Sequence, residues 1–331
     1  MTRRRRIRPR FFAFLALLAG VGIGSYSLLS RPIPSVAQHV DPPVARAALK
    51  PPSSFYTLTP FGLPEGLSNF SAISTTGGII LVAGGQIAGG INSTTYTLTS
   101  NGAVISGSLN QPRQDGGLTL IHGNPVYFGG LTSAHQIVST AQSLNGSSPY
   151  NFLPQALYGF AAATANNITY VVGGITPIGY SANIYRINQQ GQATLWSTLP
   201  MPIAHPMAQI FRGALYIAGG ATASAKLVST IFRVSLQTKQ LSHWAEMPVG
   251  LDNGSMAVLD NRIWILGGAT RKGLSRATWV IMGKNAVVPA RPLPEPLSGA
   301  SVVSANNAIW IMGGHSPQGL SSTIYILKSS P

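Results

Sequence analysis

Polar side chains recur at one position of this sequence, and their types suit hydrogen bonding to a polar ligand. Each lies fourteen or fifteen residues before a pair of consecutive glycines, and the set is Asn69, Asp115, Tyr158, His205, Asp252 and Ser298. Two near-identical phrases, "LPEGLS" and "LPEPLS", add Glu65 and Glu295, so four of the seven acidic residues belong to this pattern. Carboxylate, imidazole and amide groups gathered in one pocket suit a glycan or another small polar molecule.

Charged residues beside this set extend the candidate site. Arg113 stands next to Asp115, and the segments after the glycine pairs add His135, Lys226, Arg271, Lys272 and His315. We predict that Asn69, Arg113, Asp115, Tyr158, His205, Asp252, Arg271 and Ser298 bind a ligand. The alternative is that these are exposed loop residues that bind water or satisfy backbone groups, because loops attract polar residues in any case.

Motifs for metal, phosphate and nucleophile chemistry are missing from the sequence. The six histidines are isolated from one another, and no His, Cys or Asp cluster has the spacing of metal ligands. Neither a G-x-S-x-G nor a Walker sequence occurs. The sequence therefore predicts neither a metal nor a cofactor.

The glycine pairs themselves mark an internal repeat. Their first members are Gly84, Gly129, Gly173, Gly219, Gly267 and Gly313, at steps of 45, 44, 46, 48 and 46 residues. Self-similarity at such a period is typical of propellers and solenoids. Each unit contains four short apolar stretches separated by turn-forming residues, as in 206–211, 214–220, 229–235 and 240–246. The sequence thus predicts an all-β fold.

Aromatic residues keep the same period as the glycines. One follows the first glycine by twelve or thirteen residues in five units, at Tyr96, Tyr185, Phe232, Trp279 and Tyr325, and a tryptophan near the end of the unit occurs at Trp196 and Trp244. Together with a glycine pair after a hydrophobic strand, these positions resemble the kelch repeat family over about residues 53–331. Six such units imply a six-bladed kelch-type β-propeller. Ala141 replaces the aromatic residue in the second unit, and units one and five lack the tryptophan.

This resemblance implies where the polar residues lie. In propellers, the loop that enters each innermost strand and the loop after the second strand share one face, so the candidate ligand residues are expected around the mouth of the central channel. The last unit ends one strand short, and residues 54–59 resemble the fourth strands of other units. We therefore expect this N-terminal strand to close the last blade. The glycines are expected to let the chain bend and neighbouring blades approach closely.

Two kinds of kelch enzyme offer comparisons. The galactose-oxidase type uses a tyrosine cross-linked to cysteine, and this chain has no cysteine. The bacterial sialic-acid epimerase or mutarotase type is a single exported six-bladed domain, whose reaction needs an acid and a base around a sugar ring. By that resemblance Glu65, Glu295 and His315 are the candidate catalytic residues. No loop motif matches that family residue by residue, so the resemblance is one of fold.

The N-terminus has the layout of an export signal. "MTRRRRIRPR" is followed by 19 uncharged, mostly apolar residues. Residues 1–30 are interpreted as a signal peptide or an uncleaved transmembrane anchor, 31–52 as a Pro-rich tether and 53–331 as the propeller. Both alternatives place the propeller outside the cytoplasm, either anchored on the outer side of the cytoplasmic membrane or secreted.

Charge and composition narrow the function classes. The formal net charge is +15, but six of the 22 basic residues lie in the first ten positions, and the remainder form no basic stripe. We therefore expect no nucleic-acid partner. With no cysteine the exported domain has no disulfides, so its stability must come from packing or closure. The scarcity of acids fits either an acidic external habitat or ordinary drift.

These observations predict a binding or interaction module, monomeric, whose partner is a glycan, an envelope component or a protein. The alternative is a carbohydrate epimerase or mutarotase that uses carboxylates at the channel mouth. The membrane is a partner only through the N-terminal segment.

Overall fold

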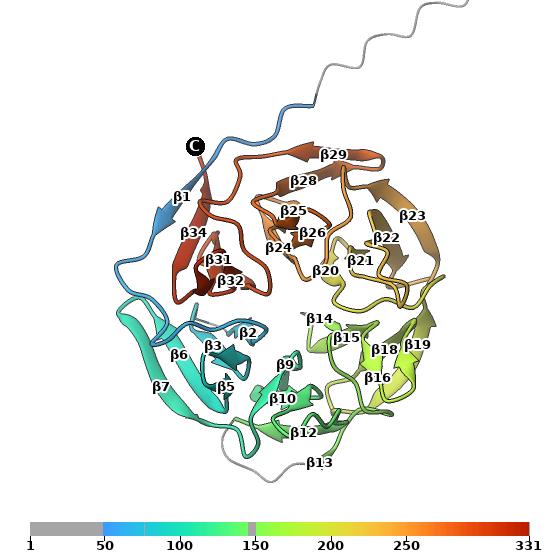
Figure 1. Ribbon diagram of the computed structural model, residues 1–331. Coiled ribbons are helices and arrows are strands. Elements are labelled where there is room, and N and C mark those ends of the chain that lie inside the picture. The colour runs from blue at the N-terminus through green and yellow to red at the C-terminus, as the bar shows by residue number, and fades with distance from the viewer. Residues whose placement is uncertain (1–48, 76, 145–149, 331) are drawn as a thin grey trace, which may run out of the picture. The chain divides into compact units, whose positions relative to one another are not determined.

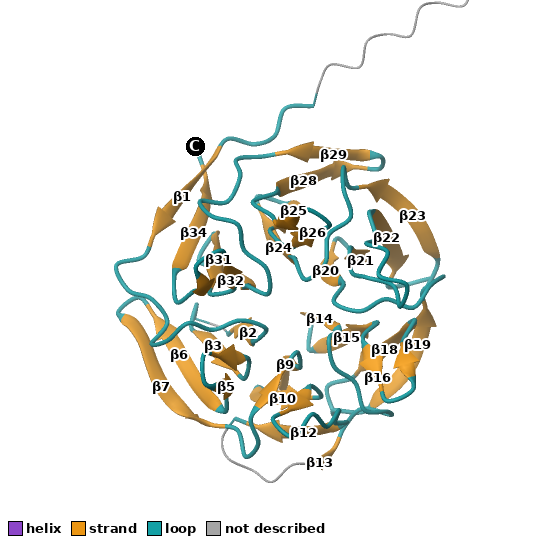
Figure 2. Cartoon of the chain, in the orientation of Figure 1, coloured by secondary structure: helices purple, strands orange, loops and turns teal. Residues whose placement is uncertain are grey.

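The computed structural model describes residues 49–75, 77–144 and 150–330. All regular elements in these ranges are β-strands (Figure 2). Six four-stranded antiparallel sheets surround a central axis, and each sheet runs from an innermost to an outermost strand (Figure 1). This arrangement is a six-bladed β-propeller, as the repeat predicted.

Blades one to six follow the chain, which runs from the innermost strand outward in blades one to five. Blade one contains β2 (Ser71–Ser74), β3 (Ile80–Ala83), β6 (Thr94–Thr99) and β7 (Gly102–Ser108). Blade two contains β9 (Gly117–Ile121), β10 (Asn124–Phe128), β12 (Thr140–Ser143) and β13 (Tyr150–Asn151). Blade three contains β14 (Ala161–Ala165), β15 (Ile168–Val172), β18 (Asn183–Ile187) and β19 (Ala193–Thr198).

The remaining blades repeat the order, and in blade six the outermost strand comes from the N-terminal side of the chain. Blade four contains β20 (Met207–Phe211), β21 (Ala214–Ala218), β22 (Thr230–Ser235) and β23 (Leu241–Glu246). Blade five contains β24 (Ser255–Leu259), β25 (Arg262–Leu266), β28 (Thr278–Gly283) and β29 (Ala286–Pro289). Blade six contains β30 (Ser301–Ala305), β31 (Ala308–Met312), β34 (Ile324–Ser329) and β1 (Ser54–Leu58).

Short two-stranded ribbons follow the glycine pairs or precede the inner strands. They are β4 (Gln86–Ile87) with β5 (Gly90–Ile91), β8 (Arg113–Gln114) with β11 (Leu131–Thr132), β16 (Ile175–Thr176) with β17 (Gly179–Tyr180), β26 (Ala269–Thr270) with β27 (Gly273–Leu274), and β32 (His315–Ser316) with β33 (Gly319–Leu320). All of them belong to loops at one end of the blades.

The hydrophobic core lies between adjacent blades. One cluster joins Tyr216 and Trp244 of blade four to Ile263 and Trp279 of blade five. The second strands are buried almost throughout, and all five residues of β21 are buried, because this strand is covered by a neighbour on each side. The apolar runs that precede each glycine pair are therefore what a two-sided core requires. The tryptophans serve in this packing, as with Trp264, which is fully buried and donates its indole N–H to the Leu259 carbonyl.

The glycine pairs join each blade to the next. The amide of Gly268 donates a hydrogen bond of 2.7 Å to the carbonyl of Leu297 in the segment entering the following blade. A Cβ on Gly267 would lie 2.5 Å from that same oxygen, and Gly267 has φ +63°. All six pairs make the equivalent contact, with Arg113, Leu157, Ile203, Leu251, Leu297 and Leu67 as the acceptors. The predicted close approach of blades is confirmed, and only glycine allows it.

The first described strand lies in the same sheet as the last. β1 pairs antiparallel with β34 over five residue pairs, from Ser54 opposite Ser329 to Leu58 opposite Tyr325 (Figure 1). The Tyr56 hydroxyl lies 2.9 Å from the Thr278 hydroxyl of blade five and donates to the Arg291 carbonyl at 3.1 Å. Strand β1 thus contacts two blades.

The predicted signal or anchor at 1–30 and most of the tether at 31–52 lie outside the described residues. No helix long and apolar enough to cross a membrane occurs within 49–75, 77–144 and 150–330.

Candidate functional site

The loops entering the six inner strands meet in a ring of backbone hydrogen bonds around the channel. The amide of Asp115 donates to the carbonyl of Asn69, and each later blade repeats this step to the blade before it. The ring members, which we call the collar, are Asn69, Asp115, Gly159, His205, Asn253 and Gly299, and their N···O distances lie between 2.7 and 3.3 Å. The amide of Asn69 donates to Gly299, so the ring has no free end.

All six collar residues adopt left-handed backbone conformations, with φ between +48° and +64°. Glycine, asparagine and aspartate tolerate this region best, and histidine is also enriched there. In three blades the collar residue is the one that follows the predicted residue, namely Gly159, Asn253 and Gly299. Tyr158, Asp252 and Ser298 immediately precede the collar, and each forms a β-bridge with the residue after a glycine pair.

Two collar glycines leave room for neighbouring side chains. Over Gly299, Asn253 donates its side-chain amide to Oδ1 of Asn69 at 2.9 Å. Over Gly159 lies the imidazole of His205, since a Cβ at Gly159 would approach His205 Nε2 to 2.7 Å. The predicted residues Asn69 and His205, and the unpredicted Asn253, therefore place their side chains over neighbouring collar glycines.

Three titratable side chains meet at the mouth. Nδ1 of His205 lies 3.7 Å from Oδ1 of Asp252, an ion-pair distance too long for a hydrogen bond. Burial tends to lower the pKa of His205, but the carboxylates of Asp252 and Asp115 outweigh it and hold this pKa above its usual value. Burial raises the pKa of Asp115 to about 6, although His205 and the amide of Gln114 favour the ionised form.

Tyr158 belongs to the same group. Burial, and then the charge of Asp115, raise the pKa of this tyrosine. The collar residues, and the residue between each of them and the following inner strand, surround a cavity of about 120 Å³, and the channel beyond it holds about 190 Å³. Both volumes lie below the range of about 300–1,000 Å³ typical of enclosed small-molecule sites.

The two glutamates are each held by a tyrosine of their own blade. The Tyr96 hydroxyl donates to Glu65 at 2.6 Å, and the Tyr325 hydroxyl donates to Glu295 at 3.0 Å. Burial, reinforced by the glutamate in each case, raises the pKa of both tyrosines to about 12. In the described part of the chain, no hydrogen bond or ion pair joins the two glutamates. The similar sequences "LPEGLS" and "LPEPLS" therefore have a shared structural role: a hydrogen bond between glutamate and tyrosine fixes the loop that enters the blade.

Arg113 is a correction to the predicted site. Its side chain is fully buried, with Nη1 donating to the Thr140 carbonyl at 2.8 Å and Nη2 to the Thr140 hydroxyl at 2.9 Å. Other blades have a buried aliphatic residue here, namely Leu67, Leu157, Ile203, Leu251 and Leu297. Ala141 follows Thr140 and replaces the aromatic residue of the other blades, so the guanidinium reaches a place where a large ring is missing. The structure removes Arg113 from the ligand group.

The other predicted residues lie on the loops of the same face. His315 opens β32 and is exposed, while its backbone exchanges two hydrogen bonds with Ser298. Ser298 is buried, with its hydroxyl 3.5 Å from the Asn253 carbonyl. Arg271 is exposed at the tip between β26 and β27. In the residues that the structure describes, no group of three or more His, Cys, Asp or Glu is placed to hold a metal ion.

The partly buried carboxyl of Asp115 predicts that the free energy of unfolding increases on acidification. In the folded protein this carboxyl takes up a proton near pH 6, whereas the unfolded chain does so near 3.8. His205 likewise takes up its proton first in the folded state. The folded protein therefore holds more protons between these values, and its free energy of unfolding should increase by about 1–2 kcal/mol from pH 7.5 to pH 5.

Asp115→Asn is the matched variant, because asparagine already occupies the equivalent collar position at Asn69 and Asn253. It should unfold at a higher temperature than the parent at pH 7.5, by about 2 kcal/mol in free energy, with a flatter pH profile. Thermal unfolding from pH 4.5 to pH 8 measures both. A variant that is less stable than the parent at pH 7.5 would show that the charge at Asp115 stabilises the collar.

Fold and site together define a class: a six-bladed β-propeller with a polar channel mouth. A solved structure titled "Structure of YjhT" is similar to this chain, with a TM-score of 0.67 and 14% sequence identity. The match covers 81% of this chain and 95% of that chain, and at this identity it shows a shared fold alone. No protein-family model and no curated protein matches the chain, so the kelch assignment stays a prediction.

Proposed function

We propose that this protein is a binding module whose channel mouth holds a partner that donates hydrogen bonds. The observation that supports this most is Oδ1 of Asp252, which is buried and accepts no hydrogen bond within the described structure. A buried carboxylate oxygen without a donor is costly, and a hydroxyl or ammonium group of a partner would satisfy it. A glycan, an envelope component or a protein side chain can supply such a group.

The size of the cavity supports binding rather than turnover. About 120 Å³ at the collar accommodates a single polar group, and a complete sugar ring would have to remain outside it. The partner is then a larger molecule that presents one polar group at the mouth, where His205 lines the cavity and Asp252 lies beside His205. This arrangement favours surface recognition at the mouth over an enclosed reaction.

The second candidate is a sugar isomerase, and one observation favours it. Asp115, with a pKa of about 6, shares the mouth with His205, and such a pair can exchange protons near neutral pH. In this alternative the acid and base are Asp115 and His205 rather than Glu65, Glu295 and His315, since the glutamates are bound by tyrosines.

The location proposed for this module is the outer side of the cytoplasmic membrane or the extracellular medium. The basic and then apolar N-terminal sequence supports this location, and the absence of cysteine is compatible with it. We propose a monomer that meets its partner through the channel-mouth face.

A thermal-shift screen tests the binding function. The probes are galactose, N-acetylglucosamine, sialic acid and peptidoglycan fragments, applied to the parent protein and to Asp252→Asn. We expect one probe class to raise the unfolding temperature of the parent, and Asp252→Asn to weaken that binding about 10- to 100-fold, the effect of a lost charge-assisted hydrogen bond. Glu246→Gln, on the outermost strand β23 and in the lining of neither the collar cavity nor the channel, should bind as the parent does.

Two outcomes would contradict the proposal. The first is equal binding by Asp252→Asn and the parent. The second is conversion of a sugar probe between anomers or epimers, followed by proton NMR, which would establish the isomerase instead. Loss of that conversion in Asp115→Asn would then assign the chemistry to the mouth.

A further inference from the structure

A cavity of about 450 Å³ lies between blades four and five, away from the collar. It opens beside the hairpin turns that connect β20 to β21 and β24 to β25. Because β20 runs from the collar at His205 to its turn at Arg212, these turns lie at the opposite ends of the inner strands. The volume falls within the range of ordinary small-molecule sites. This cavity, which we call the arginine pocket, is lined by Phe211, Arg212, Tyr216, Arg233, Trp244, Asp260, Asn261, Arg262, Ile263, Ile281, Met282 and Gly283.

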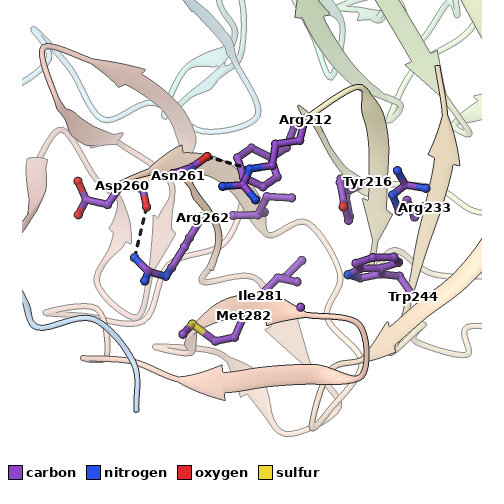
Figure 3. A pocket seen from close by; sticks show the side chains of 12 residues that line it. Arg212, Tyr216, Arg233, Trp244, Asp260, Asn261, Arg262, Ile281 and Met282 are labelled. Atoms are coloured by element: carbon purple, nitrogen blue, oxygen red, sulfur yellow. Dashed lines mark hydrogen bonds between the residues drawn. The ribbon is translucent and has the colours of Figure 1, made fainter. Parts of the chain in front are cut away.

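Three guanidinium groups line the arginine pocket without a carboxylate partner. Arg212 donates from Nε to the side-chain oxygen of Asn261 at 3.1 Å, and Arg262 donates to the backbone carbonyl of Asp260 at 3.3 Å (Figure 3). Both acceptors are neutral. In the described part of the chain, the ion pairs involve only His205 with Asp252 and His243 with Glu246. The pocket therefore carries excess positive charge, reduced only by Asp260.

The wall on the blade-four side is aromatic and has unused donors. Tyr216 and Trp244 meet edge to face with ring centroids 5.8 Å apart, and the Arg233 guanidinium lies 5.3 Å from the Trp244 ring centroid (Figure 3). Nε1 of Trp244 and Nε of Arg233 are both buried and donate to no acceptor in the described structure. Buried donors are nearly always satisfied, so two beside one cavity point to an acceptor supplied from outside.

The opposite side of the pocket is apolar. Ile281 and Met282 of β28 lie across from Trp244 (Figure 3), and Ile263 of β25 also lines the pocket. A ligand that fills the pocket must satisfy both surfaces. It needs an anionic group for the guanidinium and indole N–H donors, and an apolar or aromatic body for the side chains of β25 and β28.

We propose that the arginine pocket binds a small organic carboxylate with an apolar or aromatic body. The carboxylate accepts hydrogen bonds from the Nε atoms of Arg233 and Trp244, and Arg212 and Arg262 attract it toward the opening. The body lies against Ile281 and Met282. This site is independent of the channel mouth, since neither collar residues nor Asp252 line the pocket.

Calorimetric titration of the full-length protein with phenylacetate at low salt tests the proposal. We expect saturable binding of phenylacetate and much weaker binding of 2-phenylethanol, which keeps the ring but lacks the charge. Acetate, which keeps the charge but lacks the body, should also bind at least 10-fold more weakly. Raising the ionic strength to 0.3 M should weaken the phenylacetate interaction.

Variants locate the site. Arg233→Gln should weaken phenylacetate binding 10-fold or more, and Trp244→Phe, which keeps a ring but removes the N–H, several-fold. Arg271→Gln, which removes an exposed arginine on the collar face, should bind as the parent does, and so should Asp252→Asn. Unfolding temperatures show whether each variant is folded.

The proposal is overturned if phenylacetate does not bind, or if 2-phenylethanol binds equally well. It is also overturned if folded Arg233→Gln and Trp244→Phe both retain full affinity. Equal binding of acetate and phenylacetate would reduce the pocket to a simple anion site and remove the apolar body from the proposal.

Discussion

Replacing Gly267 with alanine is expected to destabilise the propeller by roughly 3 kcal/mol. The left-handed backbone at φ +63° costs an alanine about 1 kcal/mol or more. The added Cβ would lie 2.5 Å from the Leu297 oxygen, so the blades must separate and the Gly268 hydrogen bond to that oxygen must lengthen. A buried backbone pair that loses its partner costs a further 1–3 kcal/mol or so. Thermal and urea unfolding measure the loss.

Two glycines serve as matched controls for Gly267→Ala. Gly213 also has a left-handed backbone, at φ +71°, but no atom lies within 4 Å of the position of its Cβ, so Gly213→Ala reports backbone strain alone. Gly283 has neither a positive φ nor a close neighbour, and Gly283→Ala should be nearly neutral. If Gly267→Ala unfolds at the same temperature as Gly213→Ala, blade contact is not the reason for the paired glycines.

Deleting residues 53–60 is expected to abolish cooperative folding. The deletion removes β1, whose five pairs with β34 provide the outer strand of blade six, and exposes a strand edge on β34. It also removes Tyr56, whose hydroxyl contacts blade five at Thr278 and Arg291. Far-UV circular dichroism and analytical gel filtration should show an aggregated or unfolded product in place of the native protein.

A control and a milder variant keep this prediction testable if the deletion does not express. Removing residues 42–49 takes out an equal length before β1 and should leave the unfolding temperature unchanged. Tyr56→Phe keeps the strand and loses only the hydroxyl contacts, for an expected cost of about 1 kcal/mol. A 53–60 deletion that unfolds at the temperature of the parent would show that blade six is stable with three strands.

The number of blades and the four strands of each could be predicted, because every blade needs the same residue types at the same positions. A buried second strand must be apolar on both faces, and a glycine pair must follow it wherever the next blade approaches, as at Gly267. These requirements repeat at each blade, so the same pattern in six units makes the prediction of the fold stronger than a single unit would. The kelch name does not follow from them, and it stays a prediction.

The candidate site could be predicted only in part. Counting back from the glycines predicted that Asn69, Asp115, His205 and Asp252 lie on the loops at the channel mouth, but it did not predict which residue of each loop belongs to the collar. The sequence does contain a signal for the collar, because all six positions hold residue types that tolerate positive φ. This signal is recognisable only once the ring of backbone hydrogen bonds is known. The structural roles of Glu65 and Arg113 could not be predicted, because their partners are distant in sequence: Tyr96 binds Glu65 and Thr140 binds Arg113.

The arginine pocket was not predicted because its members come from two blades, and the repeat pattern marked only aromatic residues among them, such as Trp244. Arg212, Arg233 and Arg262 lie on a turn, a third strand and a second strand. Exposed turns attract arginine for solubility alone. The unpartnered buried donors that distinguish this pocket exist only in the folded arrangement of Arg233 and Trp244.

The collar also determines how the molecule comes apart. Its six hydrogen bonds all run from each blade to the blade before it, while the glycine-pair bonds run from each blade to the blade after it. The blades are thus linked by two circuits of opposite sense. An open array of repeats can lose its terminal unit by breaking one interface, but a closed circuit must break two before any unit is released. Fraying from the ends, the usual first step in repeat proteins, is therefore suppressed, and the propeller should resist proteases until it opens as a whole.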